Sequence, residues 1–185
     1  MNENSDQQLV KSYLDGEEES LVVLLRRYFQ PIYVFVYGMV KNDGLAEDLT
    51  QDIFIKTWQK LSKYDPEQSF KVWLYRLARN LVVDYWRKNR EDIFSSFETE
   101  SGLKFEDILI DNEQTLLEQY INKEEIDNLR VVLDNMSVND RQVLDLYYKN
   151  DLNFREIAEV LEESIDTIKS RQRRALIKLK KLIEL

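Results

Sequence analysis

The chain has 185 residues and a formal net charge of −9; 43% of its residues are hydrophobic and 33% are charged. This length accommodates one ordinary domain or two small ones, and a content of only four Gly and two Pro favours a helical fold over a disordered chain. The absence of Cys excludes disulfides and thiolate metal sites, and the absence of His removes the commonest general base, which argues against an enzyme.

The chain also lacks the sequence signals of a membrane or secreted protein. No apolar run approaches the roughly 20 residues that cross a bilayer. The first residues are polar and acidic, unlike a secretory signal. We therefore expect a cytoplasmic protein with no membrane insertion, no cofactor and no metal site.

Charge is distributed unevenly along the chain. Residues 71–90 contain six basic residues and one acidic residue, whereas residues 91–140 contain fourteen acidic and three basic residues. Residues 164–181 are basic again, with seven Lys or Arg and one Asp. Two cationic segments separated by an acidic one indicate two binding surfaces for an anionic partner such as nucleic acid.

The hydrophobic pattern predicts an all-α fold. Apolar residues recur at helical spacing, and no stretch alternates with a period of two residues. The acidic middle includes Ser and Gly and has no sustained helical period. We predict two small helical domains, residues 1–90 and 121–185, joined by an acidic linker over residues 91–120.

The first domain is expected to hold four helical segments. The first has an apolar face formed by Leu21, Leu24, Leu25 and Tyr28. Pro31 is expected to start or kink the second, and Asn42-Asp43-Gly44 to form a turn before the third, over residues 45–61. The fourth is expected over residues 70–89, with an inward face of Trp73, Leu77 and Leu81.

The second domain has the pattern of a helix-turn-helix. Asn153 and Glu156 form a capping pair for its first helix, and Ser164 is placed to cap the second. Glu162 stands in the turn, where many such motifs have Gly. The expected buried residues are Ile157, Ala158, Leu161, Ile168, Ala175, Leu179 and Leu182.

The second of these helices leaves a basic face outward. Its residues at the position of a DNA recognition helix are Thr167, Lys169, Ser170, Arg171, Arg173 and Arg174. Arg gives two hydrogen bonds to guanine, while Lys, Ser and Thr contact phosphates or bases less selectively. A basic amphipathic helix is also typical of a solvated face or of a membrane-surface or partner helix, and this alternative stays open.

Aromatic and basic residues interleave between Tyr64 and Arg90. Exposed rings beside cations hold unpaired bases through stacking and charge neutralisation. Individual rings, Trp73 among them, are alternatively core residues. Asn80 can both donate to and accept from a base edge.

Three segments resemble the signature segments of the extracytoplasmic-function (ECF, group 4) sigma factors of bacterial RNA polymerase, within the sigma-70 family. They are "AEDLTQDIFIKTW", "SFKVWLYRLARNLVVDYWRK" and "REIAEVLEESIDTIKSRQRRAL", and their order and spacing agree with the family. The resemblance covers nearly all of both domains. It implies core RNA polymerase and promoter DNA as partners, an anti-sigma factor as inhibitor, and no catalysis.

The resemblance also implies roles for individual residues. Those matching the core-polymerase interface are Asp48, Gln51, Asp52, Phe54 and Trp58, with core packing as the alternative for Phe54 and Trp58. Those matching the −10 DNA interface are Tyr64, Phe70, Arg76, Asn80, Arg87 and Lys88, and Tyr64 and Asn80 correspond to a pocket for a flipped base. The outward residues of the recognition helix match the −35 interface.

Several alternatives remain at this point. The acidic linker has three interpretations: a path through the charged channels of the polymerase, an autoinhibitory segment that folds back on the basic helices, or a spacer. One rival function is a stand-alone helix-turn-helix regulator that binds duplex operator DNA without polymerase. Another is a helical interaction protein whose basic tail binds an acidic partner or a membrane.

Overall fold

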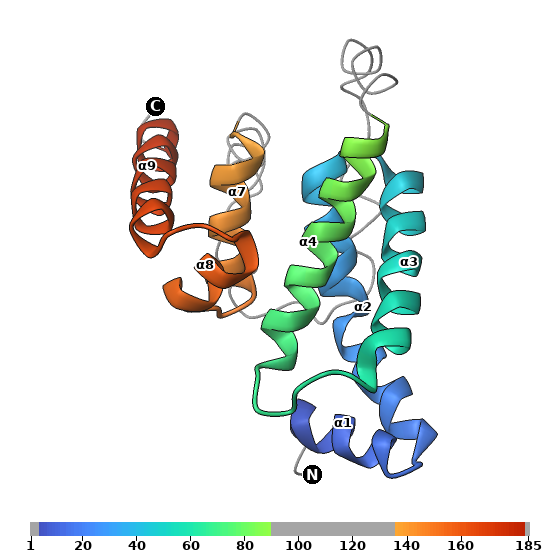
Figure 1. Cartoon of the computed structure of the whole chain (residues 1–185). Helices are drawn as coiled ribbons and strands as arrows, with labels where there is room; N and C mark the ends of the chain where they lie inside the picture. The colour runs from blue at the N-terminus through green and yellow to red at the C-terminus, as the bar shows by residue number, and fades with distance from the viewer. Residues whose placement is uncertain (1–3, 90–135, 184–185) are drawn as a thin grey trace, which may run out of the picture.

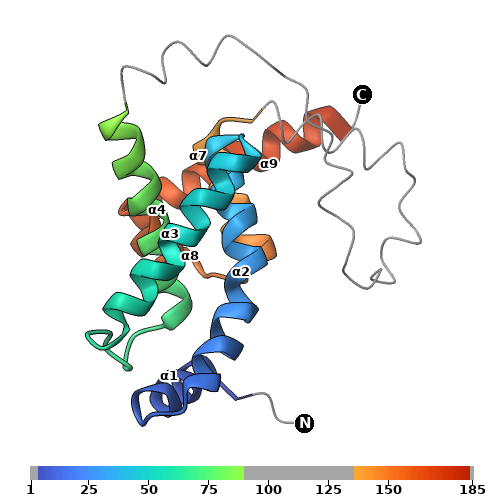
Figure 2. The same cartoon turned by 90° about the vertical axis from the view of Figure 1, so that its right-hand side faces the viewer.

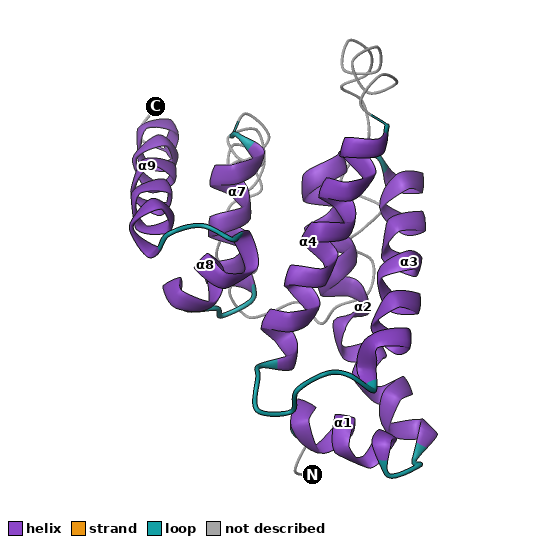
Figure 3. Cartoon of the chain, viewed as in Figure 1, coloured by secondary structure: helices purple, strands orange, loops and turns teal. Residues whose placement is uncertain are grey.

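A computed structural model describes residues 4–89 and 136–183, with side chains up to residue 180. The predicted linker over 91–120 lies outside these residues. Across the described part, seven α-helices and one π-helical turn account for the regular structure, and no strand is present (Figure 3). This confirms the predicted all-α fold. None of the helices over these residues contains an apolar stretch of the length that spans a bilayer.

Four helices form the first domain: α1 (Asp6–Leu14), α2 (Glu18–Val40), α3 (Asp43–Leu61) and α4 (Phe70–Lys88). Figure 1 shows α2, α3 and α4 running alongside one another, with α1 across one end. Their facing sides are filled by large buried side chains such as Leu24, Ile53 and Leu74, each 0% exposed. The bundle thus follows from apolar stripes that recur at helical spacing.

The helix α1 was not predicted from the sequence. It begins with a capping box, in which Ser5 Oγ accepts from the Gln8 backbone N–H and the Gln8 side chain accepts from the Ser5 N–H. Its Asp6 carboxylate accepts hydrogen bonds from Arg27 and Tyr28 of α2. These bonds and the burial of Leu9 and Val10 hold the short helix on the bundle.

Two helix boundaries in this domain differ from the prediction. Of the two outcomes expected at Pro31, a new helix or a kink, a new helix does not start there, because α2 continues through Pro31 over 23 residues. Buried residues on both sides of it, Tyr28 and Ile32, hold the helix against the bundle despite the missing N–H. The link from α2 to α3 is also shorter than predicted: Lys41 ends α2 in the left-handed region, and Asn42 caps α3 through a 2.9 Å bond from the Leu45 N–H.

The second domain contains α7 (Val138–Leu144), the π-helical turn η2 (Asp145–Lys149), α8 (Phe154–Leu161) and α9 (Ile165–Ile183). The predicted caps are confirmed: Asn153 and Glu156 form a capping box for α8, and Ser164 Oγ accepts from the Thr167 N–H at 3.1 Å. Predicted core residues that are buried are Ile157, Ala158, Leu161, Ile168 and Ala175. Leu179 is half-buried, and the Leu182 side chain lies outside the described residues.

The two domains pack against each other, with α8 beside α4 and α7 beside α2 (Figures 1 and 2). One continuous apolar cluster includes buried residues of both domains. As a result α4 is buried on two faces. The predicted face contains Leu81, which is buried, and Trp73 and Leu77, which are half-buried; the second face, which sequence analysis missed, contains Val72, Tyr75, Ala78 and Val82.

Candidate nucleic-acid and polymerase interfaces

The middle of α4 presents polar groups next to the second domain. Arg76 and Asn80, both expected at the −10 element, are half-buried and lie one helical turn apart. Arg76 forms a 3.0 Å ion pair with Glu159 Oε1 of α8. Asn80 Nδ2 donates to Glu162 Oε1 at 3.1 Å. Both predicted DNA contacts are therefore engaged by carboxylates of the helix-turn-helix domain.

An open groove of about 270 Å³ lies between α3 and α4 beside these contacts. Its lining residues are Lys56, Lys60, Trp73, Arg76, Leu77, Asn80, Leu81 and Asp84. Three cations, an amide and an indole ring in one groove suit an unpaired base with its flanking phosphates. Sequence analysis missed Lys56 and Lys60; their spacing of four residues, which places both on one face of α3, was the available signal.

Tyr64 and Phe70 lie in the core of the first domain, 6% and 1% exposed. The Phe70 ring packs against Tyr28, with centroids 5.5 Å apart, and against Tyr64 at 5.7 Å. Burial, with the nearby charges of Asp6 and Asp65, raises the pKa of Tyr64 to about 12. Its protonated hydroxyl donates to the Gln68 carbonyl. Because its ring is enclosed by other rings, Phe70 is a packing residue in this conformation rather than a surface contact.

The end of α4 carries the last two residues of the expected −10 set. Arg87 and Lys88 are both exposed. Arg87 forms a 2.9 Å ion pair with Asp84 on the same helix, in which both side chains are more than half exposed. Exposed pairs of this kind contribute little to stability, so Arg87 can exchange Asp84 for a phosphate at low cost.

The expected −35 residues lie together on the first half of α9. Four of them are exposed: Lys169, Ser170, Arg173 and Arg174. Two are half-buried and have partners in the turn: the Thr167 hydroxyl lies 2.8 Å from Ser164 Oγ, and Arg171 forms a 2.8 Å ion pair with Glu163. The structure thus brings all six onto one helix and leaves four directed to solvent.

A charged contact anchors α9 on α7. Lys178 Nζ lies 2.9 Å from Asp140 Oδ2. Burial alone raises the pKa of Asp140, but hydrogen bonds from Lys178 and Ser137 and the charges of Lys178 and Arg174 outweigh it and hold that pKa below its usual value. Lys178 is therefore part of the domain's internal structure, a role that sequence analysis did not predict.

The expected polymerase residues lie on the outer side of α3. Asp48, Gln51, Asp52 and Trp58 are exposed. The Trp58 side chain is held in place, since its Nε1 donates to Tyr13 Oη at 2.9 Å. Phe54 is only 9% exposed and stacks beneath Phe29, with centroids 5.6 Å apart. Phe54 is therefore packed in the core, the alternative considered for it from the sequence, whereas the Trp58 ring is available to a partner.

Sequence analysis missed other apolar side chains that α2 and α3 expose. Val22, Phe29 and Ile55 are 48%, 51% and 52% exposed, and Trp58 is 57% exposed. Large apolar side chains on the surface are typical of protein interfaces when they gather with aromatic anchors. Their position off the predicted inward face of each helix was the signal that could have identified them.

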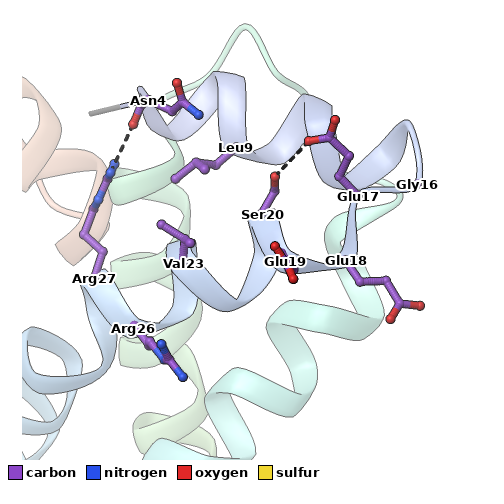
Figure 4. Close-up of a pocket in the computed structure, with 10 residues that line it drawn as sticks. All are labelled: Asn4, Leu9, Gly16, Glu17, Glu18, Glu19, Ser20, Val23, Arg26 and Arg27. Atoms are coloured by element: carbon purple, nitrogen blue, oxygen red, sulfur yellow. Dashed lines mark hydrogen bonds between the residues drawn. The ribbon is translucent and has the colours of Figure 1, made fainter. Parts of the chain in front are cut away.

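A larger open hollow lies between α1 and the start of α2 (Figure 4). One side of it is acidic, with Glu17, Glu18 and Glu19. Ser20 Oγ donates to Glu17 at 3.4 Å, and Arg27 donates to the Asn4 carbonyl at 3.0 Å. Carboxylates repel nucleic acid, so we assign this hollow no part in DNA contacts.

Comparison with known proteins identifies both domains. Residues 24–91 match the family model of Sigma-70 region 2, and residues 132–181 match that of Sigma-70, region 4. The chain is 29% identical over 176 residues to the ECF RNA polymerase sigma factor SigW of Bacillus subtilis, covering 93% of each chain. It is also 29% identical over 173 residues to SigX of the same organism, covering 91% of this chain and 86% of SigX.

Solved structures show the same fold. CnrH, in complex with the cytosolic domain of CnrY, aligns with a TM-score of 0.65 and 20% identity, covering 98% of each chain. The sigma factor RpoE of Bartonella quintana, in complex with the anti-sigma factor NepR, aligns with a TM-score of 0.66 and 22% identity, covering 87% of this chain and 94% of RpoE. Two helical domains of this kind are therefore an arrangement already seen in experimental structures.

Proposed function

Since this chain belongs to the extracytoplasmic-function group of the sigma-70 family, we propose that it binds core RNA polymerase and directs promoter-specific initiation. In this function it recognises the −35 and −10 elements and helps to melt the DNA. The observation that carries the proposal is the ordered match of regions 2 and 4 over the two helices, α4 and α9, that present basic residues. We assign residues 1–90 to polymerase and −10 binding, and residues 121–185 to −35 binding.

The groove between α3 and α4 is the part that we assign to the −10 element. Trp73 offers a ring for stacking, and Asn80 offers an amide for a base edge. Arg76, Lys56 and Lys60 supply positive charge for the strand's phosphates. Extruding a base costs a few kcal/mol, which stacking and base-edge hydrogen bonds offset. Binding energy, without nucleotide hydrolysis, would then drive melting, so the protein has no catalytic step of its own.

We assign −35 recognition to α9. Arg173 and Arg174 are exposed and suited to bidentate contacts with guanine. Lys169, Ser170 and Thr167 lie at the start of the same helix, where side chains position a recognition helix on phosphates.

We assign polymerase binding to α3. Asp48, Gln51 and Asp52 give it an acidic and polar face for basic and polar groups of the clamp. The exposed Trp58 ring is the expected anchor, because aromatic residues concentrate the binding energy of interfaces. Phe29 and Ile55 extend the apolar part of this surface.

Two further features belong to the proposal. CnrH and RpoE were solved with the cytosolic domain of CnrY and with the anti-sigma factor NepR, and we propose that an anti-sigma factor likewise sequesters this chain. Its work with RNA polymerase places it in the cytoplasm. The linker over 91–120 would pass between the two promoter contacts, as its acidic composition suits a path along positively charged polymerase channels.

The stand-alone regulator is not favoured. It leaves the exposed face of α3 and the groove beside α4 without a role, and both lie within the region 2 match. Promoter-directed run-off transcription with purified core polymerase tests the choice. We expect specific transcripts only when the protein is added. Tight operator binding without any effect on core polymerase would support the regulator instead.

A further inference from the structure

We infer that the free protein excludes the −10 strand by covering α4 with its own helix-turn-helix domain. The inference rests on the proposed function, since it concerns the helix that we assign to the −10 element. It arises from a set of contacts between α4 and the segment from η2 to the end of α8, in which donors expected to meet DNA are bound to groups of the same chain.

The first part of the contact is a polar anchor at Asn150. Lys71 Nζ donates to the Asn150 carbonyl at 2.6 Å, and the Tyr75 hydroxyl donates to Asn150 Oδ1. Tyr75 is 0% exposed, and burial raises the pKa of its hydroxyl well above the usual value. The hydroxyl therefore remains a hydrogen-bond donor, and the Tyr75–Asn150 bond joins the domains through two neutral side chains, beside the bond from the Lys71 ammonium.

The second part is a pair of carboxylates placed over the basic residues of α4. Glu159 pairs with Arg76 at 3.0 Å, and Glu162 receives Asn80 Nδ2 at 3.1 Å and lies 3.5 Å from Arg79. A carboxylate offers these donors the same anionic acceptors as a phosphate or a base edge. Arg76 and Asn80 also line the groove, so α8 sits at its edge and competes with a DNA strand for the same groups.

The ion pairs and the shared apolar cluster contribute unequally to the stability of the closed form. The ion pairs are partly exposed, with Glu159 and Glu162 side chains 47% and 54% exposed, so each stabilises the closed form only weakly. Closure is held mainly by the shared apolar cluster, in which Tyr75 and Leu146 are both 0% exposed. The acidic residues orient the domains and repel nucleic acid from α4.

The backbone of Glu162 supports a role for its side chain. It adopts φ 52° and ψ 45°, a left-handed conformation that is unfavourable for an L-residue other than Gly. A Gly would occupy this turn without that cost. This unfavourable backbone occurs at the residue whose side chain contacts both Asn80 and Arg79.

Two consequences follow for the free protein. Its apparent affinity for the −10 strand is its intrinsic affinity multiplied by the open fraction, and contacts that require separated domains shift the population towards the open state. By this inference α8 has an autoinhibitory role of the kind that the charge pattern suggested for the linker. The linker itself lies outside the described residues.

The test compares the wild-type full-length protein with two kinds of variant. Glu159→Gln/Glu162→Gln removes the two negative charges. Asn150→Ala removes the side-chain half of the polar anchor, the Oδ1 that accepts from Tyr75, without a change of charge, and leaves the backbone carbonyl that accepts from Lys71. Tyr75→Phe, which removes one hydroxyl, repeats the neutral test should Asn150→Ala fold poorly. The matched control is Glu18→Gln/Glu47→Gln, because these residues are exposed and lie on α2 and α3.

Two measurements are made on each protein without polymerase. One is the Kd for a fluorescent single-stranded −10 oligonucleotide. The other is the distance between spin labels on Lys11→Cys and Arg155→Cys, which is straightforward because the chain has no Cys. We expect both kinds of variant to bind the oligonucleotide roughly 3–10-fold more tightly and to populate longer distances. The control should change neither.

Two results would overturn closure. One is an open distance distribution in the wild type. The other is tighter oligonucleotide binding by Glu159→Gln/Glu162→Gln alone, with the Kd values of Asn150→Ala and Tyr75→Phe equal to that of the wild type. Such a result would mean that removal of negative charge, and not opening of the domains, strengthens binding. Run-off transcription by each protein with saturating core polymerase judges the proposed function separately. Transcription by the wild-type protein, together with an unchanged oligonucleotide Kd in the variants, defeats only closure. Absence of transcription with the wild-type protein defeats the sigma-factor role, and the spin-label distances still test the contact between α4 and α8.

Discussion

Glu162 Oε1 accepts a 3.1 Å hydrogen bond from Asn80 Nδ2, although the two residues are 82 positions apart in the chain. The bond joins the turn of the helix-turn-helix to the middle of α4. The backbone of Glu162 is left-handed, so the residue that makes this contact between the domains also has a strained backbone.

Replacement of Glu162 separates these two effects. Glu162→Gly removes the side chain and relieves the turn, whereas Glu162→Gln keeps the left-handed backbone strain. We expect Glu162→Gly to have the larger unfolding free energy of the two variants, by about 1 kcal/mol. Urea denaturation followed by far-UV circular dichroism measures the difference. A less stable Gly variant would contradict the assignment of strain.

Alanine substitutions at Trp58 and Phe54 should affect different properties, polymerase binding for Trp58 and stability for Phe54. Trp58 is exposed, so Trp58→Ala should leave the fold intact and weaken binding to core polymerase by at least tenfold, a typical effect for an aromatic anchor. Phe54→Ala empties a packed site beneath Phe29 and should cost about 3 kcal/mol of stability. Thermal denaturation and a core-polymerase binding assay separate the two effects. If Trp58→Ala lost as much stability as Phe54→Ala, Trp58 would be a packing residue and its assignment to the polymerase interface would be wrong.

Arg174 is expected to act on DNA sequence preference. It is exposed on α9, and loss of a bidentate contact with guanine costs about 1–3 kcal/mol of discrimination at one base pair. Arg174→Ala should therefore narrow the difference between promoters that differ at that base pair of the −35 element, at constant salt. The measurement is holoenzyme transcription from a set of single-base promoter variants. An equal loss of transcription from all the promoter variants would indicate that Arg174 contacts a phosphate and not a base.

Substitution of Arg171, unlike that of Arg174, should reduce the stability of the protein, because Arg171 has a partner within the chain. It pairs with Glu163, whose Oε2 is buried without a hydrogen-bond partner in the described structure. Arg171→Ala removes the cation from Glu163, whose side chain is only 25% exposed, and should cost about 1 kcal/mol of stability. The double variant Arg171→Ala/Glu163→Ala should recover part of the loss in thermal denaturation. An unchanged melting temperature in Arg171→Ala would show that the pair is not structural.

The Lys178–Asp140 contact predicts a pH dependence. Because the pKa of Asp140 is lowered in the folded protein, the contact stabilises the fold above the unfolded pKa of about 3.9, and this contribution is lost as pH falls through the folded value. Lys178→Met should cost about 1 kcal/mol at pH 7, and the cost should shrink below about pH 4. Urea titrations of both proteins across this range provide the measurement. A cost independent of pH would indicate lost packing alone.

Local features were predictable because short-range chemistry decides them. The capping pair of Asn153 and Glu156 and the cap at Ser164 follow from residues three positions apart. The basic face of α9 likewise follows from helical spacing. Pro31 starts no new helix, although its local preference opposes a continuous one, because packing of α2 on its neighbours outweighs that preference.

The sequence by itself determined the all-α fold, the helix-turn-helix and the two cationic segments, since periodicity and charge are properties of neighbouring residues. Only the tertiary structure decided that α4 is buried on two faces, that Phe54 and Phe70 are packed and Trp58 is exposed, and that Glu159 and Glu162 meet Arg76 and Asn80. These contacts join residues about 80 positions apart, and no local pattern specifies them. Their physical reason is the burial of one apolar cluster shared by both domains.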